Sequence, residues 1–253
     1  MSSKRLGQDT VLERFRTSGA MKTLFTRGTS ELNAIMINTS GGLTSGDQFA
    51  VDITAGPGGE VVLTTQAAER AYRANAGPAR VKSRIEVAPD ANVSWLPQEL
   101  IVYDGAALAR RLSVELAQNA RFLMVEPVIF GRRAMGERVK SIRLDDRIEI
   151  RRKSRPLYSD RVRIDGNAEK VLSLSAVCRA ARAMASVVFV NPNAEARLDQ
   201  VRASLPPTGG ASLLAPDMLV ARILAKDGFE LRRSLIPILE CLKGTALPRP
   251  WSL

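Results

Sequence analysis

The amino-acid sequence predicts a mainly β fold, and three observations support this prediction. Short runs of alternating apolar and charged residues recur through the first two thirds of the chain. Turn-forming pairs of Gly, Pro and Asp separate these runs. Helical patterns are credible only near the C-terminus. Alternation with a period of two buries one face of a strand and exposes the other to solvent. Many short strands with regular turns are typical of β architectures.

Five stretches show the alternation most clearly, and each is expected to form a strand with one wet face. In the second of them, Val81 and Ile85 alternate with Arg80 and Arg84. The five stretches are 49–53, 80–87, 111–116, 147–151 and 161–164. The turn signals between them lie at 56–59, 77–78, 89–90, 104–105 and 165–166. A further apolar run, 183–190, is too short to cross a bilayer, which needs roughly 20 residues.

The first of two helices is expected within 191–207. Asn191 can cap its N-terminus, Pro192 suits its first turn, and Pro206 ends it. Every third or fourth residue of the segment is apolar, so that one face is expected to pack on the protein.

The second helix is expected within 227–244. Asp227 and Glu230 have the spacing of a capping box, although that motif usually begins with Ser or Thr. Gly244 can end the helix, and Pro237 is expected to kink it.

The length of 253 residues is enough for one large domain or two small ones. The linker-like stretch PPTGG, at 206–210, lies between the two predicted helices. We see no internal repeat and no low-complexity region. We therefore expect a single domain over residues 1–253.

The composition excludes several classes of function. The chain has no histidine, which removes Ser-His-Asp and Cys-His catalysis and the commonest ligand for zinc, nickel and copper. Cys178 and Cys241 are far apart and form no CxxC motif, so we expect two buried thiols in a reducing compartment. With 37 Lys and Arg against 26 Asp and Glu, the net charge of +11 favours an anionic partner.

The N-terminal stretch MSSKRLGQDTVLERFRTSG has no apolar segment of the kind found in signal peptides. No run of apolar residues is long enough to span a membrane. We therefore expect a cytoplasmic protein without a membrane partner.

The glycine-rich stretch NTSGGLTSGD, at 38–47, is the strongest candidate for a phosphate loop. Gly41 and Gly46 have the spacing of a P-loop, but Asp47 occupies the place of the lysine, and its carboxylate would repel a phosphate. A strand-like run follows instead of a helix, so that no helix N-terminus is available. The better interpretation is a tight turn in which glycines supply positive φ and hydroxyl groups satisfy the backbone. We therefore expect no bound nucleotide.

Three further stretches are richer in polar residues than simple turns require. They are TTQAAERAYR at 64–73, WLPQELIVYDGA at 95–106, which contains WLPQE and DGA, and EPVIFGRRAMGE at 126–137, which contains FGRRAMGE. Together with NTSGGLTSGD and the C-terminal LPRPW, and in this order and spacing, they resemble the urease accessory protein family UreD, called UreH in some organisms. The resemblance covers nearly the whole chain. Ser45 departs from it, since many members carry glycine at this position.

The resemblance implies a mainly β fold with a β-helix-like winding and two helices near the C-terminus. It implies a scaffold, not an enzyme, with neither catalytic nor cofactor-binding residues. The implied partners are UreF, the GTPase UreG and the urease apoprotein, on which the scaffold docks UreF and UreG for nickel insertion into the urease active site. Some accounts of the family propose an internal channel for nickel.

The acids inside the matching motifs are open to two interpretations. Asp47, Glu69 and Asp104 could line a transient nickel path, because carboxylates hold a hydrated divalent cation weakly. Alternatively, they cap turns or pair with arginines such as Arg70 and Arg73, which is the more usual role of buried acids. Gln66, Arg70 and Tyr72 could likewise face a partner, although the neighbouring alanines favour close packing.

The segment 132–163 is strongly basic, with ten arginines and two lysines against five acids. It is either a solvated strand face or a docking surface for an acidic protein. The excess charge also allows an alternative function, a basic β-rich nucleic-acid-binding protein, although only 5% of the residues are aromatic and no RNA-binding motif is present. A hydrolase with paired carboxylates is a third alternative, for which the sequence carries no motif.

Overall fold

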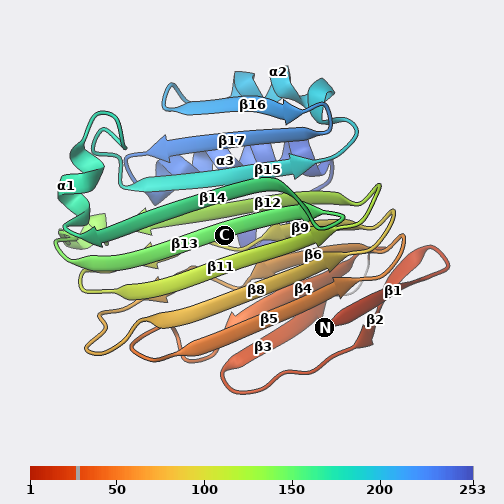
Figure 1. The fold of residues 1–253 in the computed structure, drawn as a ribbon, viewed down its shortest axis with the longest axis horizontal. Coiled ribbons are helices and arrows are strands. Elements are labelled where there is room, and N and C mark those ends of the chain that lie inside the picture. The colour runs from red at the N-terminus through yellow and green to blue at the C-terminus, as the bar shows by residue number, and fades with distance from the viewer. Residues whose placement is uncertain (27–28, 253) are drawn as a thin grey trace.

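The computed structural model describes residues 1–26 and 29–252. Two β-sheets, which we call sheet A and sheet B, lie face to face, and two helices cover the outer face of sheet B (Figure 1). Sheet A has seven strands, in the spatial order β14 (Arg155–Gly166), β13 (Ile142–Arg152), β11 (Ala107–Leu116), β8 (Ala79–Val87), β5 (Gln48–Ala55), β1 (Ser2–Leu6) and β2 (Asp9–Arg14).

Sheet B has ten strands. Eight of them lie in the order β16 (Gly209–Ala215), β17 (Met218–Ala225), β15 (Ala183–Val190), β12 (Arg121–Phe130), β9 (Asn92–Leu96), β6 (Glu60–Thr65), β4 (Leu32–Asn38) and β3 (Met21–Thr26). The two short strands β7 (Glu69–Ala71) and β10 (Leu100–Val102) pair with each other, and β10 also pairs with β12.

The chain winds between the two sheets in successive coils. It passes from β4 in sheet B to β5 in sheet A, returns through β6 and β7, and repeats this path through β8, β9, β10, β11, β12 and β13. Each strand therefore pairs in parallel with the strand one coil away, as β5 does with β8 and β8 with β11. These stacked coils resemble a β-solenoid and confirm the predicted β-helix-like winding.

The alternating sequence pattern fills the space between the sheets. In β8, Ile85 and Val87 are buried while Arg80 and Arg84 are exposed, as the period of two requires. All five predicted strand stretches lie in strands of the structure. The apolar run 183–190 forms β15, and each of its residues is buried because sheet B has the core on both of its faces there.

Three α-helices and two short 3-10 helices complete the described fold: α1 (Ala168–Ser173), α2 (Ala194–Ser204), α3 (Gly228–Lys243), η1 (Arg133–Met135) and η2 (Arg249–Ser252). The ends of α3 are as predicted, because the Asp227 side chain accepts a hydrogen bond from the Glu230 amide and Gly244 caps the C-terminus in the left-handed conformation. The helix continues through Pro237.

The predicted start of α2 is wrong. The helix begins at Ala194, and the Asn191 side chain accepts from the Asn193 amide instead of capping the first turn. The one-turn helix α1, in which Asn167 caps the Lys170 amide, was not predicted because it is too short to show a helical period. Cys178 is buried, whereas Cys241 is half-buried, and both are free thiols. No helix among the described residues is long and apolar enough to cross a membrane.

The C-terminal segment is fastened to the core by its last aromatic residue. Trp251 is 1% exposed, and its indole Nε1 donates to the Leu96 carbonyl oxygen at 3.0 Å. The Arg232 guanidinium from α3 lies over the Trp251 ring and donates to Gln98 and Glu99. The motif WLPQE therefore joins α3 and the C-terminus to sheet B. The assignment of residues 1–253 to one domain stays a prediction.

Replacement of this aromatic anchor tests its contribution to stability. We expect Trp251→Ala to lower the free energy of unfolding by about 3–5 kcal/mol, because it leaves a cavity and removes the hydrogen bond to Leu96. The matched control is Phe229→Ala on α3, where the ring is 75% exposed and its loss should change little. The measurement is urea denaturation followed by circular dichroism. Equal midpoints for both variants would contradict the anchoring role.

Candidate functional site

The four crossovers that lead from sheet B to sheet A all lie at one end of the coils. They are 39–47, 72–78, 103–106 and 131–141, and we call them together the loop face, which lies at left in Figure 1. Each belongs to or directly follows a motif stretch singled out in the sequence. The return crossovers at the opposite end, 56–59, 88–91 and 117–120, are short turns outside these motifs. The stacking of coils therefore gathers the motifs on one surface.

Backbone hydrogen bonds join each loop of this surface to the next. The Leu43 amide donates to the Arg70 carbonyl at 2.7 Å, and the Tyr72 amide donates back to the Leu43 carbonyl at 2.8 Å. The Tyr103 amide donates to the Ala71 carbonyl at 3.0 Å. The last loop is joined in the same way, through the Gly131 amide and the Val102 carbonyl at 2.8 Å. The loop face is thus a continuation of the sheet ladder, and it is not a set of independent turns.

The glycine-rich loop has the structure of a turn, as predicted. Gly41 and Gly46 have φ of +76° and +78°. The Asp47 carboxylate accepts from the Thr44 amide at 2.8 Å, and the Thr44 hydroxyl donates to the Arg73 carbonyl. These contacts use the polar groups of the loop internally, and a strand follows it, so that the loop has neither the lysine nor the helix of a phosphate site.

Gly42 is required for a different reason, which is close packing. A Cβ atom at this position would lie 2.3 Å from the Tyr72 ring and 2.7 Å from the Arg70 carbonyl oxygen. Tyr72 in turn packs edge-on against Tyr103, with ring centroids 5.1 Å apart, and the Arg132 guanidinium lies 4.3 Å from the Tyr103 ring centroid. The glycine loop therefore supports an aromatic and basic cluster from three other loops.

Asp104 has the contacts of a structural acid. Its carboxylate accepts from the Lys140 and Ser141 amides at 2.7 and 2.9 Å, and it forms an ion pair with Arg73 at 2.9 Å. Burial acts against ionisation, but these hydrogen bonds and the Arg73 charge lower the pKa of Asp104 below its ordinary value. Glu137 serves the neighbouring loop in the same way, since it accepts from the Asp104 amide and pairs with Arg132.

Glu69 has a different environment. It is half-buried, and burial raises its pKa, although hydrogen bonds from the Asn38 side chain and the Arg70 amide oppose the shift. The negative charge of Asp47 contributes to the increase. Glu69 lines two cavities, a surface pocket of about 200 Å³ beside the glycine loop and an inter-sheet cavity of about 90 Å³. It therefore stands between the surface and the interior.

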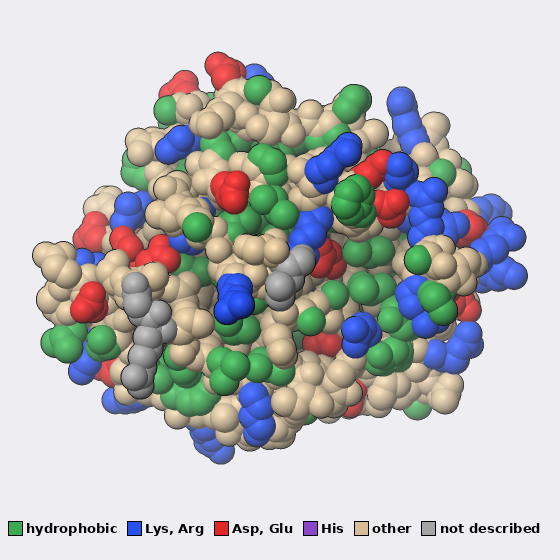
Figure 2. Space-filling view, turned by 180° about the vertical axis from the view of Figure 1, so that it is seen from behind, with side chains coloured by type: hydrophobic (Ala, Val, Ile, Leu, Met, Phe, Trp, Pro, Cys, Tyr) green, Lys and Arg blue, Asp and Glu red, His purple; other side chains and the backbone are tan. Residues whose placement is uncertain are grey.

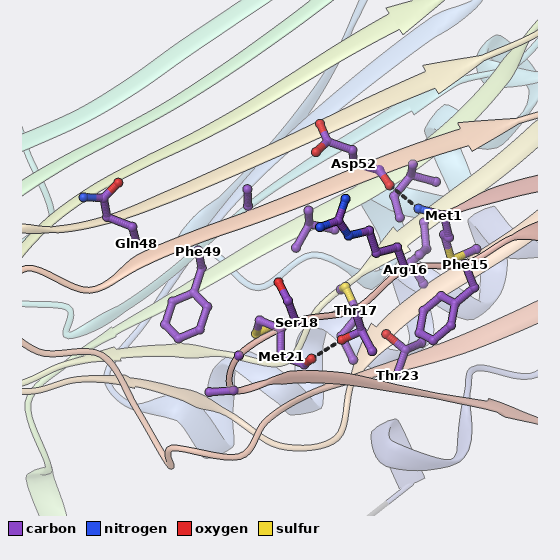
Figure 3. Close-up of a pocket in the computed structure, with 17 residues that line it drawn as sticks. Met1, Phe15, Arg16, Thr17, Ser18, Met21, Thr23, Gln48, Phe49 and Asp52 are labelled. Carbon is purple, nitrogen blue, oxygen red and sulfur yellow. Dashed lines mark hydrogen bonds between the residues drawn. The ribbon is translucent and has the colours of Figure 1, made fainter.

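A third cavity opens at the N-terminal end of the coils and has a volume of about 360 Å³. Figure 3 shows it with Phe15 and Phe49 on opposite sides and Arg16 between them. All three cavities are lined in part by Met21 and Met36. Methionine side chains are flexible, so the walls that separate the three cavities are adaptable.

The inter-sheet cavity also borders a buried charged cluster. Arg110 donates to Asp146 at 2.9 and 2.6 Å and pairs with Glu126 at 2.7 Å, and Glu126 also accepts from the Trp95 indole at 2.7 Å. Burial and the nearby Asp146 charge raise the pKa of Glu126, while Arg110 opposes the shift. The three ionisable groups carry two potential negative charges and one positive charge. Gln98, whose Nε2 has no hydrogen-bond partner among the described residues, lines the same cavity.

The three predicted site acids are not gathered into one ligand set. Glu69 lines the cavities, whereas Asp47 and Asp104 cap turns on the loop face. Among the described residues, no group of three or more His, Cys, Asp or Glu side chains is placed to hold a metal ion. The stretch EPVIFGRRAMGE begins with Glu126, but a lone acid beside apolar residues did not predict its place in a buried charged cluster.

Three side chains of the TTQAAERAYR stretch are more exposed than predicted. Gln66, Arg70 and Tyr72 are all exposed, and of the neighbouring alanines Ala71 is buried while Ala67 is exposed. Close packing therefore holds for Ala71, which β7 buries against β10, while the three polar side chains are exposed. Trp95 is buried, whereas Tyr103 is half-buried.

The basic segment 132–163 forms η1 and the β13–β14 hairpin at the edge of sheet A. Many of its charges are matched locally, and Asp145 for example accepts from both Arg147 and Arg161. Lys and Arg side chains are dense at right in Figure 2, the end that carries the loop face and lies at left in Figure 1. The loop face is thus basic as well as aromatic.

Comparison with known proteins gives a consistent result. A model of the family described as UreD urease accessory protein matches residues 1–252. A urease accessory protein UreD of Roseobacter denitrificans is 46% identical over 254 residues, which cover all of this chain and 93% of the relative. Those of Ruegeria pomeroyi and Rhizobium etli are 44% and 40% identical, and the matches cover 100% and 98% of this chain and 99% and 91% of the relatives.

The close contact at Gly42 generates a prediction about the loop face. We expect Gly42→Ala to destabilise the protein by about 1–3 kcal/mol, because the new methyl group overlaps the Arg70 carbonyl and displaces Tyr72. The control is Gly77→Ala in the next loop, where no atom lies within 4 Å of the added Cβ. Thermal unfolding of both variants is the measurement. If the two variants have the same thermal midpoint, close packing does not explain why glycine is needed at position 42.

Proposed function

The chain belongs to the UreD family of urease accessory proteins, and on this premise we propose that it acts in urease maturation as a non-catalytic scaffold. The proposed partners are UreF, the GTPase UreG and the urease apoprotein. The scaffold would dock UreF and UreG on the apoprotein, so that nickel is inserted into the urease active site. GTP hydrolysis would belong to UreG, and this chain would hold neither a nucleotide nor a tightly bound cofactor.

The loop face carries the proposal of partner binding. Its backbone is held rigidly by the ladder between coils, and its side chains Tyr72, Arg132 and Met135 are exposed or lie in the aromatic and basic cluster. Met135 is 74% exposed. Aromatic residues, Met and Arg are the types enriched at protein interfaces. A pre-organised surface of this kind favours docking because little conformational entropy is lost on binding.

We further propose that nickel, as cargo, passes from the surface pocket beside the glycine loop into the inter-sheet cavity. Glu69 lines both spaces and supplies a carboxylate, and Glu126 supplies a second one deeper inside. Asp47 and Asp104 lie on the loop face near the entrance, where their carboxylates cap turns. Isolated carboxylates bind a hydrated divalent cation weakly, which suits passage better than storage.

The alternative of nucleic-acid binding has less support. Several arginines of the basic segment pair with acids of the same sheet, as Arg147 and Arg161 do with Asp145, and are therefore partly neutralised. Retention on heparin compared with capture by UreF separates the two functions, because a nucleic-acid-binding protein would be retained and would not need UreF.

Deletion of the chain from a urease-producing cell tests the scaffold. We expect urease subunits to remain abundant but poor in nickel and inactive, because the step that fails is metal insertion. Purified urease would be assayed for nickel by mass spectrometry. Expression of the wild-type chain is the control and should restore nickel loading. Normal nickel content in the urease of the deletion strain would refute the proposal.

Amide replacements separate a nickel path from a structural role. We expect Glu69→Gln to leave the thermal midpoint nearly unchanged, since the amide oxygen can still accept from Asn38, while nickel per urease active site falls because the charge is lost. Asp104→Asn is the comparison. It should lower the midpoint near pH 7, because it weakens charge-assisted hydrogen bonds to Arg73 and the two amides.

The pH dependence provides a check on this comparison. Because folding lowers the pKa of Asp104, its stabilisation is present above the unfolded value of about 3.9 and is lost as the pH falls through the lower folded value. The difference in thermal midpoint between the wild type and Asp104→Asn should therefore disappear at acid pH. The path would be refuted if Glu69→Gln lowered both the nickel loading and the thermal midpoint, or if it lowered neither of them. The scaffold proposal would still stand, because the deletion experiment tests it separately.

A further inference from the structure

We propose that a second site, at the end of the molecule opposite the loop face, binds a small tetrahedral oxyanion such as phosphate. The site is a cavity of about 190 Å³, well above the 10–15 Å³ or so that a single water needs. It lies where β9 and β12 begin, where β15 ends, and between the start of α2 and the end of α3, at right in Figure 1. This inference does not depend on the proposed function.

The charge of the cavity walls has one sign. Arg121, Arg197 and Lys243 contribute to the lining, and the described residues that line the cavity include no Asp or Glu. Lys243 is occupied by an ion pair with Glu31 at 3.0 Å. The two arginines are much less engaged, since the nearest carboxylate to Arg121 is that of Glu60 at 3.9 Å, and Arg197 donates only to Gln200, at 3.3 Å, among the described residues.

Two polar side chains in the same wall have no internal partner. Ser94, on β9, is only 5% exposed, and its hydroxyl makes no hydrogen bond with the described residues. Asn193, which precedes α2, makes no side-chain capping bond. Both side chains lie in the wall of a cationic cavity, where they can donate to a ligand that accepts hydrogen bonds.

The combination of these groups selects the chemistry of the ligand. Arginine presents several N–H donors in a planar fork that matches the oxygens of phosphate, and charge-assisted hydrogen bonds of this type are the strong ones. The Ser94 hydroxyl and the Asn193 amide add neutral donors. The two arginines would repel a cation, and an apolar ligand would use none of the donors in the wall. A tetrahedral oxyanion satisfies both the charge and the donors.

Titration calorimetry of the full chain with inorganic phosphate tests the site. We expect saturable binding with one site per chain, and a loss of affinity of about tenfold or more in Arg121→Gln and in Arg197→Gln, because each removes a charge-assisted hydrogen bond. Ser94→Ala should weaken binding less. The matched control is Arg233→Gln, which removes an exposed arginine of α3 outside the cavity and should bind as the wild type does.

Thermal midpoints measured without phosphate show whether each variant is folded. Arg197 lies on the surface of α2, so its replacement should leave the fold intact. Absence of binding to the wild type at millimolar phosphate, or equal affinity in all four variants, would overturn the proposal. A second arm with glycerol 3-phosphate identifies the source of the phosphate. Tighter binding of this ester than of inorganic phosphate indicates a phosphoryl group carried by a larger molecule, and the reverse order indicates free phosphate.

Discussion

Parallel pairing between successive coils is the constraint on which the rest of this structure depends. Because β5, β8 and β11 lie one strand spacing apart, about 4.8 Å, the loops that precede them must stack at the same interval. Their amides and carbonyls then satisfy one another, as those of Leu43 and Tyr72 do. Only a residue without a side chain fits at Gly42, where the Arg70 carbonyl approaches closely. The aromatic and basic cluster of the loop face rests on this packing.

Local features of the fold could be predicted from the sequence, and pairings between distant segments could not. The period of two located the strands, and the Asp227 side chain and Gly244 located the ends of α3, because those signals lie within a few residues of the structure that they specify. Asn191 misled the prediction of α2, since its side chain serves the Asn193 amide. The β-helix-like winding came from the family resemblance, because neither periodicity nor turn signals say which sheet a strand joins.

In the candidate site, too, local features could be predicted and contacts between distant segments could not. The motif stretches supplied the residues of the loop face but not their meeting on one surface, and the alternative of a pair between Asp104 and an arginine such as Arg73 followed from ordinary charge pairing. The buried cluster was missed because Arg110 and Asp146 are 36 residues apart and meet only through the pairing of β11 with β13. The raised pKa of Glu126 likewise arises from burial, which depends on the finished fold.

The charge distribution has a consequence for the proposed passage of nickel. The chain carries a net charge of +11, and its loop face is basic, so a free divalent cation is repelled from the surface. The interior is different, because Glu69 lines the cavity and Arg110 faces two carboxylates. Buried ion clusters seldom stabilise a protein, and under the proposed function this one would guide a cation. Under the proposed function, a cation then enters only where a docked partner covers the basic rim and releases its metal directly at Glu69, which makes the scaffold a conduit between proteins and not a scavenger of metal from solution.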